Sequence, residues 1–157
     1  MNQMNRKETQ NQSGFTLLEV LIALLILSIG LLGLAALQTT GLRSNQMASM
    51  RTLATQLAYD MTDRMRANPV GVAAQQYVIA TNETPADPPI TRADNDLTEW
   101  RAQVARLPGG LSSITRSAGP PVTHDISVYW DEERKEATLG SCPPADNSEL
   151  QCLRLTM

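Results

Sequence analysis

Apolar residues are distributed unevenly along this chain of 157 residues. Among the first 14 positions only Met1 and Met4 are apolar, whereas residues 15–37 read FTLLEVLIALLILSIGLLGLAAL, with Glu19 as their single charge. A helix rises 1.5 Å per residue, so this run would be about 34 Å long, enough to cross the hydrocarbon core of a bilayer. The pattern therefore predicts a transmembrane helix over 15–37, preceded by a polar segment over 1–14.

The helical pattern continues beyond the apolar run. Apolar side chains recur there every three or four residues: Met47, Met50, Ala54, Leu57, Met61 and Met65. Asn68-Pro69 should end the helix, because proline disfavours helical geometry in the preceding residue and has no backbone N–H to donate. The spacing predicts an amphipathic extension over 38–67, and we expect its methionine stripe to pack against the rest of the protein rather than to bind a ligand.

A second helix is predicted to open at 94–96, where Asp96 can cap the free backbone amides and Glu99 follows three residues later. Four apolar positions form one stripe along this helix: Leu97, Trp100, Val104 and Leu107. The Pro-Gly-Gly sequence at 108–110 should end it. The residues between the two helices read as loop, apart from a short strand at 77–79.

Strand patterns dominate the last part of the chain. Residues 122–130 alternate between apolar and polar positions, the period of a half-buried strand. A further strand is predicted to begin near Ile114, and 137–139 and 153–157 can pair beside them. These elements predict an α+β fold, in which a small antiparallel sheet of three or four strands in a globular head, 68–157, lies on the long helix.

Composition and charge narrow the classes of function. The chain is 42% apolar with a net charge of −3, which describes a globular protein. Residues 38–67 carry a net charge of +2, whereas 68–157 carry seven basic and twelve acidic side chains, a net charge of −5. Nucleic-acid binding requires clustered lysine and arginine, so we expect none here. We interpret the unequal charges as two solvated surfaces.

The only two cysteines, Cys142 and Cys152, are ten residues apart in the sequence. An even pair in a small domain fits an oxidising compartment, and closing a loop of this size would contribute roughly 2–3 kcal/mol. We therefore expect a disulfide. Metal binding is a poor alternative, because two cysteines and the distant His124 do not supply four ligands at the usual spacings.

The sequence lacks motifs for catalysis and for cofactor binding. It has no nucleophile elbow, no phosphate-binding loop and no pair of carboxylates placed for acid and base roles. The acidic cluster at 94–96 fails as a calcium loop, because Glu99 stands where glycine is needed. His124 is expected to be a core or edge histidine with satisfied hydrogen bonds. We predict no enzymatic activity, no cofactor and no small-molecule substrate.

Glu19 is the unusual residue of the apolar run. A carboxylate costs up to about 3 kcal/mol at the centre of a bilayer, so an ionisable group within a span indicates a function. Two alternatives compete with that interpretation. Glu19 could be protonated, or it could reach the headgroups, since it lies only four residues inside the run.

The sequence around Glu19 is similar to that of a known family. Residues 13–21, SGFTLLEVL, resemble the type IV prepilin signal, in which a short polar leader ends at glycine before a phenylalanine. The resemblance implies that prepilin peptidase cleaves between Gly14 and Phe15 and methylates the new amine of Phe15. It also implies that Glu19 neutralises the Phe15 amine of a neighbouring subunit during assembly. The protein would then insert into the bacterial inner membrane, in contact with its lipid, with a periplasmic head, before it enters the pilus.

Softer motifs resemble minor pilins of the PilV type. They are IGLLGLAALQ at 29–38, QLAYDM at 56–61 and RMRANP at 64–69. This resemblance implies partners among other minor pilins, the major pilin and the inner-membrane assembly machinery, with roles in priming pilus assembly, adhesion and twitching motility. Two alternatives remain open. One is a minor pseudopilin of type II secretion, and the other is a periplasmic enzyme or receptor for which 15–37 is only a tether.

Overall fold

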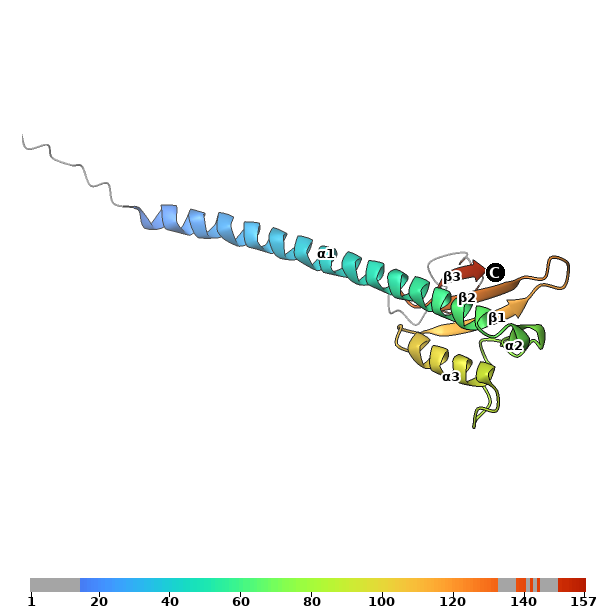
Figure 1. Ribbon diagram of the computed structural model, residues 1–157. Helices are drawn as coiled ribbons and strands as arrows, with labels where there is room; N and C mark the ends of the chain where they lie inside the picture. The colour runs from blue at the N-terminus through green and yellow to red at the C-terminus, as the bar shows by residue number, and fades with distance from the viewer. Residues whose placement is uncertain (1–14, 133–137, 141, 143, 145–149) are drawn as a thin grey trace, which may run out of the picture. The chain divides into compact units, whose positions relative to one another are not determined.

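The computed structural model describes residues 15–132, 138–140, 142, 144 and 150–157. Three helices are followed by three strands (Figure 1): α1 (Leu17–Arg66), α2 (Pro69–Ala73), α3 (Arg92–Val104), β1 (Leu111–Arg116), β2 (His124–Trp130) and β3 (Gln151–Thr156). The chain divides into two compact units, Met1–Arg43 and Ser44–Met157. Helix α1 contributes to both units, because it begins in the first and ends in the second.

The described part of the first unit is the apolar half of α1. Every side chain from Phe15 to Arg43 is exposed. Among the described residues, α1 is the one helix long and apolar enough to cross a membrane, with a mean hydropathy of 2.9 over its most apolar window of 18 residues. A helix that is apolar on all sides needs lipid or other protein around it. This half of α1 is therefore a candidate membrane anchor.

The second unit is built on the amphipathic half of α1. Its buried positions are Ala54, Leu57, Ala58, Met61, Thr62 and Met65. Met50 and Leu53 are partly buried against the same core. The expectation that the methionine stripe packs against the rest of the protein is therefore confirmed for the residues from Met50 to Met65.

The three strands form one antiparallel sheet in the order β1-β2-β3. Ile114, Ile126 and Leu155 lie opposite one another across it, and Ile114 and Ile126 are fully buried in the core that includes the α1 stripe. Met157 continues the pairing beyond β3, because its backbone N–H and C=O both bond to His124, at 3.0 and 2.9 Å. The predicted α+β fold, a long helix packed on a small antiparallel sheet, is confirmed.

Helix α3 begins earlier than the sequence analysis predicted. Its N-cap is Thr91, whose Oγ1 accepts the Asp94 N–H at 3.1 Å, while the Asp94 carboxylate accepts the Thr91 N–H at 2.8 Å. This reciprocal arrangement is a capping box. The prediction that Asp96 caps the helix is wrong, because Asp96 lies inside α3 and its carboxylate bonds to groups on other elements.

Two further predictions between α1 and α3 need correction. The residues after Pro69 form the short helix α2 rather than a loop, since proline suits the first turn of a helix and the Asn68 side chain accepts the Gly71 N–H at 3.2 Å. The predicted strand at 77–79 is reduced to an isolated bridge, in which Ile79 pairs with Ile114.

The predicted strands in the last third of the chain are mostly present with shifted ends. The strand expected over 122–130 is β2, which starts at His124 because residues 117–123 form the turn from β1. Within the segment expected over 137–139, the Thr138 carbonyl accepts the Leu150 N–H at 2.9 Å, and residue 137 lies outside the described residues.

Candidate functional site

Two residues of the prepilin-like motif, Phe15 and Glu19, lie just before and within the first turn of α1, whereas Gly14 lies outside the described part of the chain. Phe15 and Thr16 precede the helix, and the Phe15 side chain is 84% exposed. Thr16 is bonded to the first turn: its carbonyl accepts the N–H groups of Glu19 at 3.1 Å and Val20 at 3.3 Å. Its hydroxyl oxygen also accepts the Glu19 N–H, at 3.2 Å. Thr16 therefore acts as the N-cap of α1.

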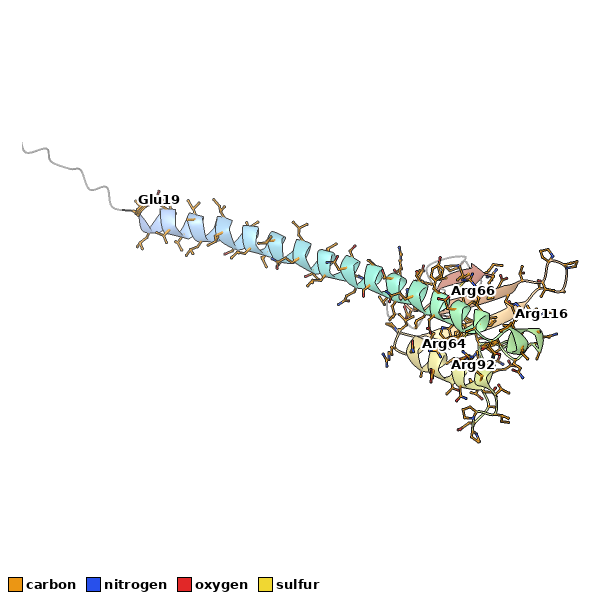
Figure 2. The ribbon with its side chains drawn as sticks, viewed as in Figure 1. Glu19, Arg64, Arg66, Arg92 and Arg116 are labelled. Carbon is orange, nitrogen blue, oxygen red and sulfur yellow. A yellow bond between two sulfur atoms is a disulfide. The ribbon has the colours of Figure 1, made fainter. Side chains whose placement is uncertain are left out.

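The Glu19 carboxylate lies near the N-terminal end of α1 (Figure 2) and is exposed. Within the described residues it forms no hydrogen bond or ion pair, because the bonds of Glu19 there are made by its backbone. The next basic residue in α1 is Arg43, 24 residues later and about 36 Å along a helix. The position of Glu19 in the first turn of α1 suits a negative charge, because the helix dipole is positive at that end. Among the residues that the structure describes, the Glu19 carboxylate therefore has no cation beside it.

The second unit contains a polar network centred on Arg64 of α1, labelled in Figure 2. The Arg64 guanidinium bonds to the carboxylates of Asp60 at 2.9 Å, Glu99 at 2.8 Å and Asp96 at 3.3 Å. The bond to Glu99 foremost, and that to Asp60, raise the pKa of Arg64. Because Asp96 and Glu99 belong to α3, the network ties the last turns of α1 to that helix.

Tyr77 extends this network into the interior. Its side chain is fully buried, its hydroxyl donates to Asp96 at 2.6 Å and it accepts from the Asn68 amide at 3.1 Å. Burial, and then the hydrogen bond to Asp96, raises the pKa of Tyr77. Trp100 adds a buried bond from its indole N–H to the Leu57 carbonyl at 2.9 Å. All these groups have partners within the protein, so their arrangement holds helices together rather than forming a reactive centre.

His124 lies on the core side of β2, with 5% of its surface exposed. Its Nε2 has no hydrogen-bond partner among the described residues, so the expectation of a fully satisfied histidine is wrong. Burial, and then the charge of Arg116 opposite it on β1, lowers the pKa of His124. A neutral imidazole without a partner at Nε2 lacks the oriented nucleophile that a catalytic histidine needs.

A polar cleft of about 520 Å³ lies between the loop at 78–86 and the start of α3. Its two carboxylates are already bonded: Glu83 accepts the Ala80 N–H at 2.8 Å, and Asp94 forms the capping box. In the described ranges, no group of three or more histidine, cysteine or acidic side chains could hold a metal ion. Both carboxylates of the cleft are therefore engaged within the protein.

Cys142 and Cys152 form a disulfide, with their Cα atoms 5.5 Å apart. Cys152 belongs to β3 and lies opposite Tyr129 of β2. The bond joins the last strand to the segment before it, as the spacing of the cysteines led us to expect.

Sequence reasoning missed two features of these sites. Thr16 was not recognised as a cap, although Thr-x-x-Glu before an apolar run is a capping signature. The Arg64 network was also missed. Its local part, Asp60 and Arg64 at a spacing of four on one helix, was readable from the sequence.

Comparison with known families locates one match, over residues 9–35, to the model described as the prokaryotic N-terminal methylation motif. The match includes the Gly14-Phe15 junction, Glu19 and the first part of α1. No curated protein and no solved structure matches the chain significantly. The motif at the start of a long apolar helix, together with the α+β fold, is consistent with a type IV pilin-like prepilin.

Proposed function

We propose that this protein is a minor pilin. The apolar segment 15–37 anchors it in the bacterial inner membrane as a single span, with the head, 68–157, in the periplasm. Prepilin peptidase cleaves between Gly14 and Phe15 and methylates the Phe15 amine. The protein then enters a type IV pilus, or the complex that initiates one, through its long helix.

The observation that carries this proposal is the carboxylate of Glu19, which lies in an otherwise apolar stretch and has no partner among the residues that the structure describes. Cleavage would create a cationic amine on Phe15, and a charge in an apolar environment is tolerated only when it is paired. A carboxylate and an amine at the same end of the same helix allow each subunit to neutralise its neighbour. Glu19 thereby selects the register in which helices associate.

The head supports a structural role for the protein rather than a catalytic one. The buried groups of Tyr77 and Asp96 are bonded to each other, and its cysteines are joined in a disulfide. The disulfide suits a periplasmic location, because such bonds persist in oxidising compartments. A membrane-anchored enzyme or receptor would have no use for Glu19, since a tether works best without a charge.

The partners follow from assembly. They are prepilin peptidase, other minor pilins, the major pilin and the inner-membrane assembly machinery. The resemblance of residues 29–38, 56–61 and 64–69 to minor pilins of the PilV type favours a role in priming the pilus and in adhesion or motility. A minor pseudopilin of type II secretion would use the same residues, so deletion should be scored by both twitching and secretion. Loss of secretion with normal twitching would favour the pseudopilin.

Mass spectrometry of the protein from cells and from sheared filaments tests the proposal. We expect a chain that begins with methylated Phe15 and is present in the filament fraction. Glu19→Ala should be processed and stable but depleted from filaments, whereas Thr40→Ala, a control on the same exposed helix, should assemble normally. An intact Met1 terminus, with no protein in filaments, would contradict the proposal.

A further inference from the structure

The loop before α3 presents one apolar side chain to solvent. Ile90 is 85% exposed, more than any other large hydrophobic residue that the structure describes in the second unit. Loops are usually more mobile than the elements they join, but this one is held on both sides. Pro88 and Pro89, which have fixed φ angles, precede Ile90, and the Asp94 carboxylate accepts the Ile90 N–H at 3.1 Å. Binding this side chain would therefore cost little loop ordering.

An apolar groove of about 450 Å³ lies beyond the other end of α3. Its lining includes Leu107 and Leu150, which are buried, and Leu111 and Leu139, which are 36% and 48% exposed. A Cβ atom at Gly109 would lie 3.6 Å from the Leu150 side chain, so glycine at this position keeps the groove open. The groove has the chemistry and the room to take a branched apolar side chain.

Helix α3 separates the Ile90 side chain from the groove. Ile90 lies two residues before the helix begins at Arg92, whereas the groove is lined by residues that follow its end at Val104. The 13 residues between these ends make about 20 Å of helix. Ile90 consequently cannot fill the groove of its own chain. Two different surfaces that meet in this way join copies head to tail, into rows rather than closed pairs.

The charges beside the two surfaces are opposite in sign. Arg92, labelled in Figure 2, follows Ile90 by two residues, and its side chain is 62% exposed. Asp131, whose backbone N–H donates to the Pro108 carbonyl at 2.7 Å, contributes an acidic residue to the groove. Opposite charges at complementary surfaces fix the orientation of a contact. Val70, the next most exposed large hydrophobic residue of this unit at 77%, has no charged residue within two positions.

We propose that the groove binds the Ile90 loop, residues 88–90, of a second copy of this protein, so that heads associate end to end along α3. In this contact Ile90 is buried against Leu111 and Leu139, and Arg92 approaches Asp131. The inference goes beyond the proposed function and does not depend on it, because neither cleavage at Phe15 nor Glu19 takes part.

Photo-cross-linking of the purified full chain in detergent micelles tests this contact. Leu111 is replaced by the photo-cross-linker p-benzoylphenylalanine in one preparation, which is mixed with an isotope-labelled chain that keeps Leu111. After irradiation, the joined peptides are identified by mass spectrometry, and the isotope label distinguishes two copies from one. The labelled chain is wild type, Ile90→Asp, Ile90→Leu or Arg92→Glu, with Val70→Asp as the matched control at another exposed apolar residue.

We expect position 111 to be joined to the 88–91 segment of the labelled chain. Ile90→Asp should lower the yield at least about tenfold, because burial of an isoleucine side chain contributes on this scale. Arg92→Glu should lower it about threefold, as suits an exposed charge pair. Ile90→Leu and Val70→Asp should match wild type.

Four results would overturn the inference: no cross-link between copies, cross-links to other segments, a yield that Ile90→Asp or Arg92→Glu leaves unchanged, or an equal loss with Val70→Asp. A wild-type chain that keeps its Met1 terminus in cells and is missing from filaments would instead reject the proposed function, without changing the result expected in micelles.

Discussion

Replacing Tyr77 by phenylalanine removes one hydroxyl from the network that joins α1 to α3. That hydroxyl is fully buried, donates to Asp96 at 2.6 Å and accepts from Asn68 at 3.1 Å. Asp96 is itself buried and keeps its contact with Arg64 at 3.3 Å. The substitution therefore leaves a buried carboxylate oxygen and an amide group without their shortest partner, while the ring stays in place.

The size of the effect follows from the charge on Asp96. A hydrogen bond to a charged group contributes about 1.5–3 kcal/mol, because the Asp96 carboxylate would otherwise stay buried without that bond and without water. Unfolding of a domain of this size shifts by roughly 4 °C per kcal/mol. Tyr77→Phe should accordingly lower the melting temperature of the head by roughly 6–12 °C.

Tryptophan fluorescence of the full chain in detergent micelles would measure this change, because Trp100 and Trp130 are both buried in the head. Tyr59→Phe is the matched control. Tyr59 is 55% exposed, and its hydroxyl has no hydrogen bond within the residues that the structure describes, so its loss should cost less than about 0.5 kcal/mol. Equal melting temperatures for the two variants would refute the network's contribution.

The same variant has a signature in alkaline solution. The pKa of Tyr77 is raised in the folded protein above its ordinary value of 10.0. The unfolded chain therefore loses this proton at a lower pH than the folded protein. The stability that the Tyr77 hydroxyl contributes is complete below about pH 10 and is lost as the pH rises through the folded pKa. Wild type should lose stability in this range more steeply than Tyr77→Phe, and parallel urea titrations of both proteins would reveal the difference.

Three further changes probe the rest of the head. Burial lowers the pKa of His124, so the stability that its neutral form contributes is present above about pH 6.5 and is lost as the pH falls through the folded pKa. Urea unfolding of wild type and His124→Leu between pH 7 and 5 should show this loss of stability only in wild type. Gly110→Ala would place a Cβ atom 2.0 Å from the Val104 carbonyl oxygen, so it should cost about 2–3 kcal/mol, whereas Gly119→Ala, which meets nothing within 4 Å, should be neutral in the same melting experiment. Cys152→Ser should lower the unfolding free energy by roughly 2–3 kcal/mol under oxidising conditions and change nothing once wild type is reduced.

The long helix and its end could be predicted because their signals are local. The apolar run is continuous, the methionine stripe keeps a helical period, and proline at 69 stops the helix close to Arg66. Gly14, Phe15 and Glu19 could be proposed for the same reason, since the family motif occupies one short stretch, within residues 9–35.

The features that sequence reasoning missed depend on distant contacts. Asp96 has the chemistry of a cap, but Tyr77 and Arg64, 19 and 32 residues away, use its carboxylate inside α3. Alternation along 122–130 correctly placed His124 on the apolar side, yet whether its Nε2 finds a partner depends on how the other elements pack. Proline at 69 was interpreted only as the end of one helix, although its fixed φ also favours the start of the next, α2.

The backbone pairing of Met157 with His124 decides where a label can be attached to follow this protein in living cells. A fluorescent protein fused after Met157 would disturb the backbone hydrogen bonds between Met157 and His124, which extend the sheet beyond β3. A tag before residue 15 would be discarded with the leader if processing occurs as proposed. The turn between β1 and β2 is the better position, because residues 118–122 are exposed and the turn is closed on either side by bonds between Ser117 and Thr123, at 2.9 and 2.8 Å. A short epitope inserted at Gly119 should therefore report on the protein without disturbing its core.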